Sequence, residues 1–246
     1  MALKKTPKNI TLELPPPPEP FDGFTSKTFS FLHGLKKNNN KDWFEAHRAD
    51  YEQELREPCK QFVTVMAAHL AETDFPLIAD QRRSLFRINR DIRFSKDKSP
   101  YKTHIGIVFP LAGLGEEEWA GMYMSFEPKG RNEITSYVGG GAYQPSAPFL
   151  KAIRGRIATD YARFSSINNS KAFRKEFPEG ITGESLIRMP KGYDEDHPAA
   201  KYLKLKEFLY GSDLTIDDLK SPKLPQIVIK KIAAAMPMLT FLAGKD

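Results

Sequence analysis

Hydrophobic positions recur at helical spacing over residues 21–70. Three helices are predicted there, the first capped by Ser26 and ended by the asparagines at 38–40, the second capped by Asn40, and the third begun by Pro58. Their apolar stripes are Phe29, Leu32 and Leu35; Trp43, His47, Tyr51 and Leu55; and Phe62, Val65, Met66 and Leu70. Because each stripe repeats every three or four residues, each helix has one face for the core.

The pattern changes near Ser84 to short β-favouring runs between turns that contain glycine or proline. The runs are Leu85–Ile88, Ile105–Phe109, Met122–Phe126 and Ile134–Val138. Since no helical pattern separates them, they predict an antiparallel sheet over about residues 84–138.

Helical spacing returns after the glycines at 139–141. Helices are predicted near 146–157, 170–177, 197–210 and 224–242, with a loop at 178–190; Pro237 is expected to kink or shorten the last helix. Helices, then strands, then helices predict an α+β fold, with the sheet covered by N-terminal and C-terminal helices. The expected core includes Trp43, Phe44, Phe62, Ile105, Ile107, Met124 and Phe149.

The first 20 residues are expected to be a disordered tail outside this fold. Prolines at 15–18 and 20 favour extended polyproline II, which acts as a spacer or as a ligand for a proline-binding module. Residues 21–246 then form a single α+β domain, because no break in composition divides them.

Positive charge changes this picture, because it is concentrated in one segment. Residues 82–102 hold eight Lys or Arg against two acids, Asp91 and Asp97, an excess equal to the net charge of +6 for the whole chain. Such a cluster needs anionic partners or solvent, and the Ile, Phe and Tyr among the cations indicate partial burial. We expect an anionic small molecule, phosphorylated or otherwise charged, to bind here through Arg87, Arg90, Arg93, Lys96, Lys98, Tyr101 and Lys102.

Several motifs extend along the chain around this segment. They are Phe21-x-Gly23-Phe24, Arg90-Asp91-Ile92-Arg93-Phe94-Ser95-Lys96-Asp97-Lys98-Ser99-Pro100-Tyr101-Lys102, Tyr123-x-Ser125-x-Glu127-Pro128, Gly139-Gly140-Gly141 and Lys191-Gly192-Tyr193-Asp194. Together they resemble an uncharacterised family catalogued as domain of unknown function 2461. The resemblance covers about residues 21–240 and implies no activity, cofactor or catalytic residue.

Two other functions remain open for the basic segment. In an RNA- or DNA-binding module, Phe86, Phe94 and Tyr101 would stack on bases while lysines contact phosphates. In a phosphoryl-transfer or hydrolytic enzyme, Asp91 or Asp97 would act as base or metal ligand and His104 as proton donor. Asp91 is also explained as the partner that orients Arg90 or Arg93, and Asp97 as a turn residue.

The remaining candidate chemistry is sparse. The five histidines form no close pair typical of zinc sites, so no metal is expected. The glycines at 139–141 predict either a phosphate-binding loop or a turn with positive φ. Cys59 is expected to be a buried, inert thiol. We expect a cytoplasmic protein without membrane contact, because the chain has one cysteine, no long uninterrupted apolar run and no secretory signal. The sequence leaves the cofactor and the oligomeric state open.

Overall fold

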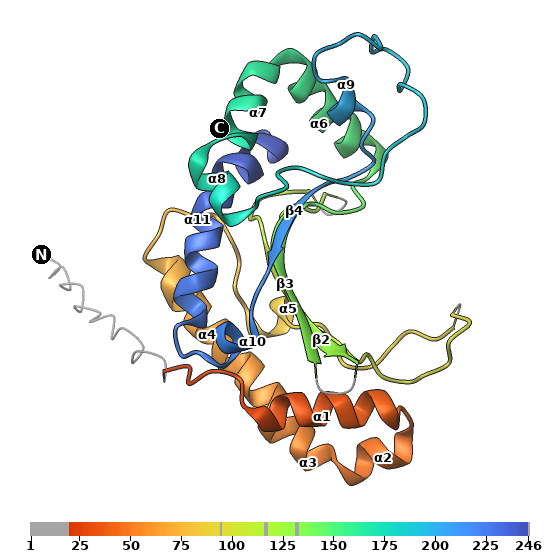
Figure 1. Cartoon of the computed structure of the whole chain (residues 1–246), viewed down its shortest axis with the longest axis vertical. Coiled ribbons are helices and arrows are strands. Elements are labelled where there is room, and N and C mark those ends of the chain that lie inside the picture. The colour runs from red at the N-terminus through yellow and green to blue at the C-terminus, as the bar shows by residue number, and fades with distance from the viewer. Residues whose placement is uncertain (1–19, 94, 116–117, 131–132, 246) are drawn as a thin grey trace, which may run out of the picture.

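The structure, a computed structural model, describes residues 20–93, 95–115, 118–130 and 133–245 (Figure 1). Phe94 and the expected tail, apart from Pro20, lie outside the described residues. The described part has the predicted α+β architecture. Along the chain, one group of helices precedes the strands of a central antiparallel sheet and a second group follows the first three strands.

Within the described residues the sheet has four antiparallel strands in the order β1-β2-β3-β4. They are β1 (Ile105–Pro110), β2 (Gly121–Lys129), β3 (Glu133–Ala142) and β4 (Phe208–Asp213). Strands β1 to β3 form the predicted meander, in which Ile107 is opposite Met124 and Met124 is opposite Val138. These three side chains are buried, so alternate positions of the meander face the core.

Two predictions about the sheet were wrong. The run Leu85–Ile88 is not a strand, because the ladder there is reduced to one isolated bridge between Leu85 and Ile107. The fourth strand is β4, whose residues 208–210 were predicted as the end of a helix over 197–210; within that range the helix is limited to Ala200–Leu203. Leu209 exchanges backbone hydrogen bonds with Thr182 on the side of β4 away from β3, so pairing on both sides fixes this segment as a strand.

The N-terminal helices follow the predicted stripes but are more divided. They are α1 (Ser26–Lys37), α2 (Lys41–Ala46), α3 (Arg48–Asp50), the π-helix η1 (Tyr51–Arg56), α4 (Glu57–Ala71) and α5 (Gln81–Ser84). Thr25, rather than the predicted Ser26, caps α1, whereas Asn40 caps α2 as predicted. The second predicted helix is therefore three short pieces that end in a π-helical turn.

The C-terminal helices are α6 (Ala147–Thr159), α7 (Tyr161–Asn168), α8 (Lys171–Glu176), α9 (Ala200–Leu203), α10 (Ile216–Lys220) and α11 (Leu224–Ala243). Ser146 caps α6 as predicted, and α7 and α10 were not predicted. Helix α11 continues past Pro237 to Ala243, so the proline does not shorten it. Met236, Met238 and Leu239 are buried around the proline, and this packing holds the helix on both sides of it.

Helices α4 and α11 cover one face of the sheet, and no helix of the described chain covers the opposite face (Figure 1). Of the predicted core, Phe44, Phe62, Ile107, Met124 and Phe149 are buried, while Trp43 and Ile105 are half-buried against it. Helix α11 is long and apolar enough to cross a membrane by length and composition. Half of that stretch is buried against the rest of the fold, as in the core helix of a soluble domain.

Candidate anion-binding site

Most of the basic segment lies in an arm, made up of the described residues 85–93 and 95–104, that projects from the body (Figure 1). Its two sides are joined where Asn89 bridges Tyr101 and where the backbone N–H of Lys102 donates to the Ile88 carbonyl at 2.7 Å. The arm therefore has a paired base next to the body and, among the described residues, a tip formed by 91–93 and 95–99.

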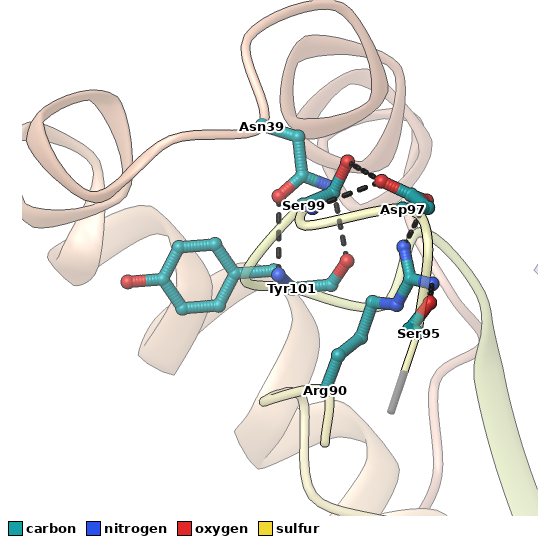
Figure 2. Close-up of polar contacts among 6 residues, drawn as sticks. All are labelled: Asn39, Arg90, Ser95, Asp97, Ser99 and Tyr101. Carbon is teal, nitrogen blue, oxygen red and sulfur yellow. Dashed lines mark hydrogen bonds and ion pairs between the residues drawn. The ribbon is translucent and has the colours of Figure 1, made fainter. Parts of the chain in front are cut away.

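The loop of the arm neutralises part of its own charge (Figure 2). Asp97 accepts hydrogen bonds from the backbone N–H of Ser99 at 2.9 Å and from its hydroxyl at 2.6 Å, and it forms an ion pair with Arg90. The bonds from Ser99, with the one from Arg90, lower the pKa of the Asp97 carboxyl. Asp97 is thus a turn residue whose carboxylate makes a poor general base.

Asp91 has a similar role beside Arg93. The Arg93 guanidinium donates from Nε to Asp91 Oδ1 at 3.0 Å and from Nη2 to Oδ2 at 2.7 Å, and these bonds lower the pKa of Asp91. Lys98 donates from Nζ to the Ile92 carbonyl at 2.9 Å, and Lys96 is exposed nearby. Asp91 therefore orients Arg93, one of the two arginines considered from the sequence.

One side of the arm borders a hollow of about 410 Å³, the arm hollow, whose lining includes Arg90, Asp97, Lys102 and His104. Burial lowers the pKa of His104, and the positive charges of Lys102 and Arg90 add to the effect, so the imidazole is neutral at pH 7. Arg90 is already paired with Asp97, and the other two cations of the described lining have neutral partners: Lys36 donates to the Pro128 carbonyl and Lys102 lies over the Phe86 ring.

A larger cleft of about 650 Å³ lies between the base of the arm and the helices α2 to α4. We call it the basic cleft. Its charged lining residues in the described chain are five cations, Lys41, Arg48, Arg56, Lys60 and Arg87, and one acid, Glu45. Walls that carry mainly one sign of charge raise the local concentration of the opposite ion.

The cations of the basic cleft differ in their partners. Three pair with neighbours in the helices: Arg48 with Glu45 at 2.7 Å, Arg56 with Glu52 at 2.7 Å and Lys60 with Glu57 at 2.5 Å. Lys41 and Arg87 have no carboxylate within ion-pair distance among the described residues, and both are exposed. These two side chains remain available for an anionic ligand.

Two tyrosines add neutral donors to the basic cleft. Tyr101 is 6% exposed, and its ring stacks on Phe44 with centroids 4.0 Å apart; Tyr51 lies 5.2 Å from the same Phe44 ring. Figure 2 shows the Tyr101 ring pointing away from Arg90 and Asp97. Neither hydroxyl makes a hydrogen bond within the described part of the chain, so both can donate to a ligand.

The π-helix η1 contributes to the wall of the basic cleft. Tyr51 and Arg56, at its two ends, both line the cleft, and Leu55 between them is buried. A π-helical turn brings residues five apart onto the same face and is frequent at functional sites. The local winding therefore directs a hydroxyl and a guanidinium to one cleft.

The predicted ligand residues do not converge on one site. Arg87 and Tyr101 line the basic cleft, and Arg90, Tyr101 and Lys102 line the arm hollow together with the enzymatic candidates Asp97 and His104. The other predicted residues, Arg93, Lys96, Lys98 and Asp91, line neither of these hollows.

The sequence did not reveal the helical half of the cleft. Residues 41–60 contain four Lys or Arg against six acids, so a count of charge hides Lys41 and Arg48. The available signal was the four-residue repeat that places Tyr51 on one helix face with Trp43 and His47.

The described residues contain no group of three or more His, Cys, Asp or Glu that could hold a metal ion. Fold and site together define an α+β protein with a basic cleft beside a projecting arm. The chain belongs to the family described as conserved hypothetical protein (DUF2461), which it matches over residues 27–241. No curated protein and no solved structure gave a significant match.

Proposed function

We propose that this protein binds a small phosphorylated or otherwise anionic ligand in the basic cleft. The observation that carries the proposal is the pair Lys41 and Arg87, which line the cleft with no carboxylate within ion-pair distance in the described chain. A guanidinium fork and an ammonium group match phosphate oxygens, and the hydroxyls of Tyr51 and Tyr101 can complete the set of donors.

The arm hollow is the weaker alternative. Its arginine, Arg90, is bound to Asp97 and Ser95, and Lys36 donates to the Pro128 carbonyl at 2.6 Å. A ligand there would have to compete with bonds that the protein already makes. Arg87 in the basic cleft makes no ion pair among the described residues, and Asp91 attracts it only from beyond ion-pair distance.

Contacts in the arm also favour binding of a small ligand over the two other functions. Tyr101 is buried against Phe44 and is therefore not accessible to a nucleic-acid base, and Phe94 lies outside the described residues. Asp91 and Asp97 have lowered pKa values, which disfavour a role as general base. We also propose a cytoplasmic location, supported by a lone cysteine, Cys59, that is buried and free.

Isothermal titration with inorganic phosphate tests the proposal. Arg87→Ala and Lys41→Ala should each weaken binding by about ten- to a hundredfold, because a charge-assisted hydrogen bond contributes about 1.5–3 kcal/mol. Lys96→Ala is the matched control, since it removes an exposed cation of the same arm outside the cleft. Equal losses in Lys96→Ala and Arg87→Ala, or no binding by the unaltered protein, would contradict the proposal.

A gel shift with random RNA and DNA oligonucleotides at two salt concentrations separates the nucleic-acid function. The proposal predicts no shift at either concentration. A salt-sensitive shift that disappears on charge reversal of Lys96 and Lys98 would favour a nucleic-acid-binding module instead.

A further inference from the structure

The face of the sheet that no helix covers carries a groove of about 770 Å³, which we call the aromatic groove. Five of its lining residues are aromatic: Phe86, Trp119, Tyr123, Tyr137 and Tyr143. Phe86 is 47% exposed and Tyr143 is 52% exposed, although large apolar side chains are usually buried. The groove is therefore a concave surface with accessible aromatic rings.

Glycines shape the floor of this groove. The Tyr137 ring lies across β4, where a Cβ on Gly211 would be 2.2 Å from its ring atoms, and a Cβ on Gly139 would be 2.4 Å from its hydroxyl oxygen. The Tyr137 hydroxyl donates to the Tyr210 carbonyl at 2.9 Å, so the ring is fixed in this position. Gly139 and Gly140 lie inside strand β3, and of the three glycines Gly141 alone has a positive φ. A phosphate-binding loop is thus excluded for residues 139–141.

The aromatic groove meets the basic cleft at one side chain. Phe86 lines both, and on the groove side its ring centroid is 6.3 Å from that of Tyr123, which is 6.4 Å from that of Tyr137. Arg87, the cleft arginine without a carboxylate partner, is the next residue in the chain. A ligand held by Arg87 can therefore extend past Phe86 onto the row of rings.

We infer that the ligand is a nucleoside phosphate, with its phosphate in the basic cleft and its base stacked in the aromatic groove. The inference rests on the proposed function and specifies the class of ligand. A row of accessible rings favours a planar aromatic group, whereas a groove for an acyl chain would be mainly aliphatic, and of the described lining residues only Val108 and Leu209 are aliphatic. The Tyr143 hydroxyl and the Gln144 amide supply polar groups for the edge of a base.

Gln144 supports this assignment independently. Its φ of +44° is the one positive value at a non-glycine residue in the described chain. Residues in this left-handed region are uncommon and occur preferentially at ligand sites, because the fold must stabilise the unfavourable conformation.

The test compares a nucleoside monophosphate, such as adenosine monophosphate, with ribose 5-phosphate and decyl phosphate by isothermal titration. Base stacking should make the nucleotide bind about tenfold more tightly than ribose 5-phosphate. Tyr143→Ala and Phe86→Ala should reduce that ratio to near one. Ile187→Ala, at a residue 95% exposed outside the groove, is the control and should leave it unchanged.

Tryptophan fluorescence gives a second readout, because the chain has two tryptophans and Trp119 lines the groove. The nucleotide should quench the emission, and Trp119→Phe should remove the quenching. If phosphates bind in an Arg87-dependent way but the base adds no affinity, or decyl phosphate binds more tightly than the nucleotide, the inference fails and the proposed function stands. If no phosphate binds, the proposed function fails as well.

Discussion

Asn39 is bonded to the backbone of Tyr101 in both directions. Its side-chain Nδ2 donates to the Tyr101 carbonyl at 2.9 Å, and its Oδ1 accepts from the Tyr101 N–H at 3.1 Å (Figure 2). The amide thus pairs with the arm as a neighbouring strand would, although the two residues are 62 positions apart. This contact ties the turn between α1 and α2 to the base of the arm, between the basic cleft and the arm hollow.

Asn39→Ala should lower the free energy of unfolding by about 1–3 kcal/mol, because it leaves partly buried backbone donor and acceptor groups unpaired. Urea denaturation measures this loss. Hydrogen exchange should show faster exchange of the Tyr101 amide. Asn39→Asp keeps an acceptor for the N–H but cannot donate to the carbonyl, so it should have an intermediate effect. Unchanged stability and exchange in Asn39→Ala would show that the arm is positioned by other contacts.

Gly211→Ala should destabilise the fold by about 1–3 kcal/mol, because the new methyl group would overlap the Tyr137 ring. Burial raises the pKa of Tyr137 to about 12, so its hydroxyl remains a donor to the Tyr210 carbonyl over the usual pH range. Gly155→Ala is the matched control, since nothing lies within 4 Å of its added Cβ and it is inside α6. The control should stabilise by about 0.5–1 kcal/mol in thermal or urea unfolding. Equal effects of the two substitutions would contradict this packing of Tyr137.

The fold could be predicted from the sequence where the hydrophobic period is long and uniform. The predicted helix with the stripe Phe29, Leu32 and Leu35 and the predicted strand β2 were both confirmed. In each, the hydrophobic pattern of the sequence agrees with the residues that are buried in the fold. Strand β4 was missed because it is short and its pairing partners, Thr182 and Gly141, are distant in sequence. Only tertiary pairing distinguishes such a segment from a helix.

Only the part of the candidate site that lies in the arm could be predicted from the sequence. Arg87 and Tyr101 belong to a segment with an obvious excess of cations, whereas Lys41 and Arg48 lie among acids. Those acids pair within their own helices, as Glu45 does with Arg48, so the net count does not describe the surface of the cleft. Which cations face one another depends on where the arm meets the helices, and no local pattern encodes that contact.

Stability should depend on the protonation of His104. Its pKa in the folded state is lowered by burial and by Lys102 and Arg90, although Glu127 acts in the opposite direction. The unfolded state then binds the proton more readily, so stability is full above the unfolded pKa of about 6.5 and falls as the pH decreases toward the folded pKa. Urea denaturation between pH 5 and about 8 should show this loss, and His104→Asn should reduce it. If the free energy of unfolding of His104→Asn fell with decreasing pH as steeply as that of the unaltered protein, another titratable group would be responsible.

Cys59 should be unreactive in the folded protein. It is 4% exposed, and burial raises its pKa, so little thiolate is present at neutral pH. Ellman's reagent at about pH 8 should react with the native protein far more slowly than with the urea-unfolded protein, because free cysteine has a pKa of about 8.5. Cys59 is one of the residues that line the basic cleft, so rapid reaction without denaturant would mean that the wall of the cleft opens in solution.

The position of a bound anion tests the central claim most directly. Crystals soaked in selenate, a phosphate-like anion located by anomalous scattering, should contain it in the basic cleft. We predict contacts with the Arg87 guanidinium and the Lys41 ammonium, and with at least one hydroxyl of Tyr51 or Tyr101. An anion bound only at Arg93 and Lys98 of the arm tip, with the basic cleft empty, would contradict the account.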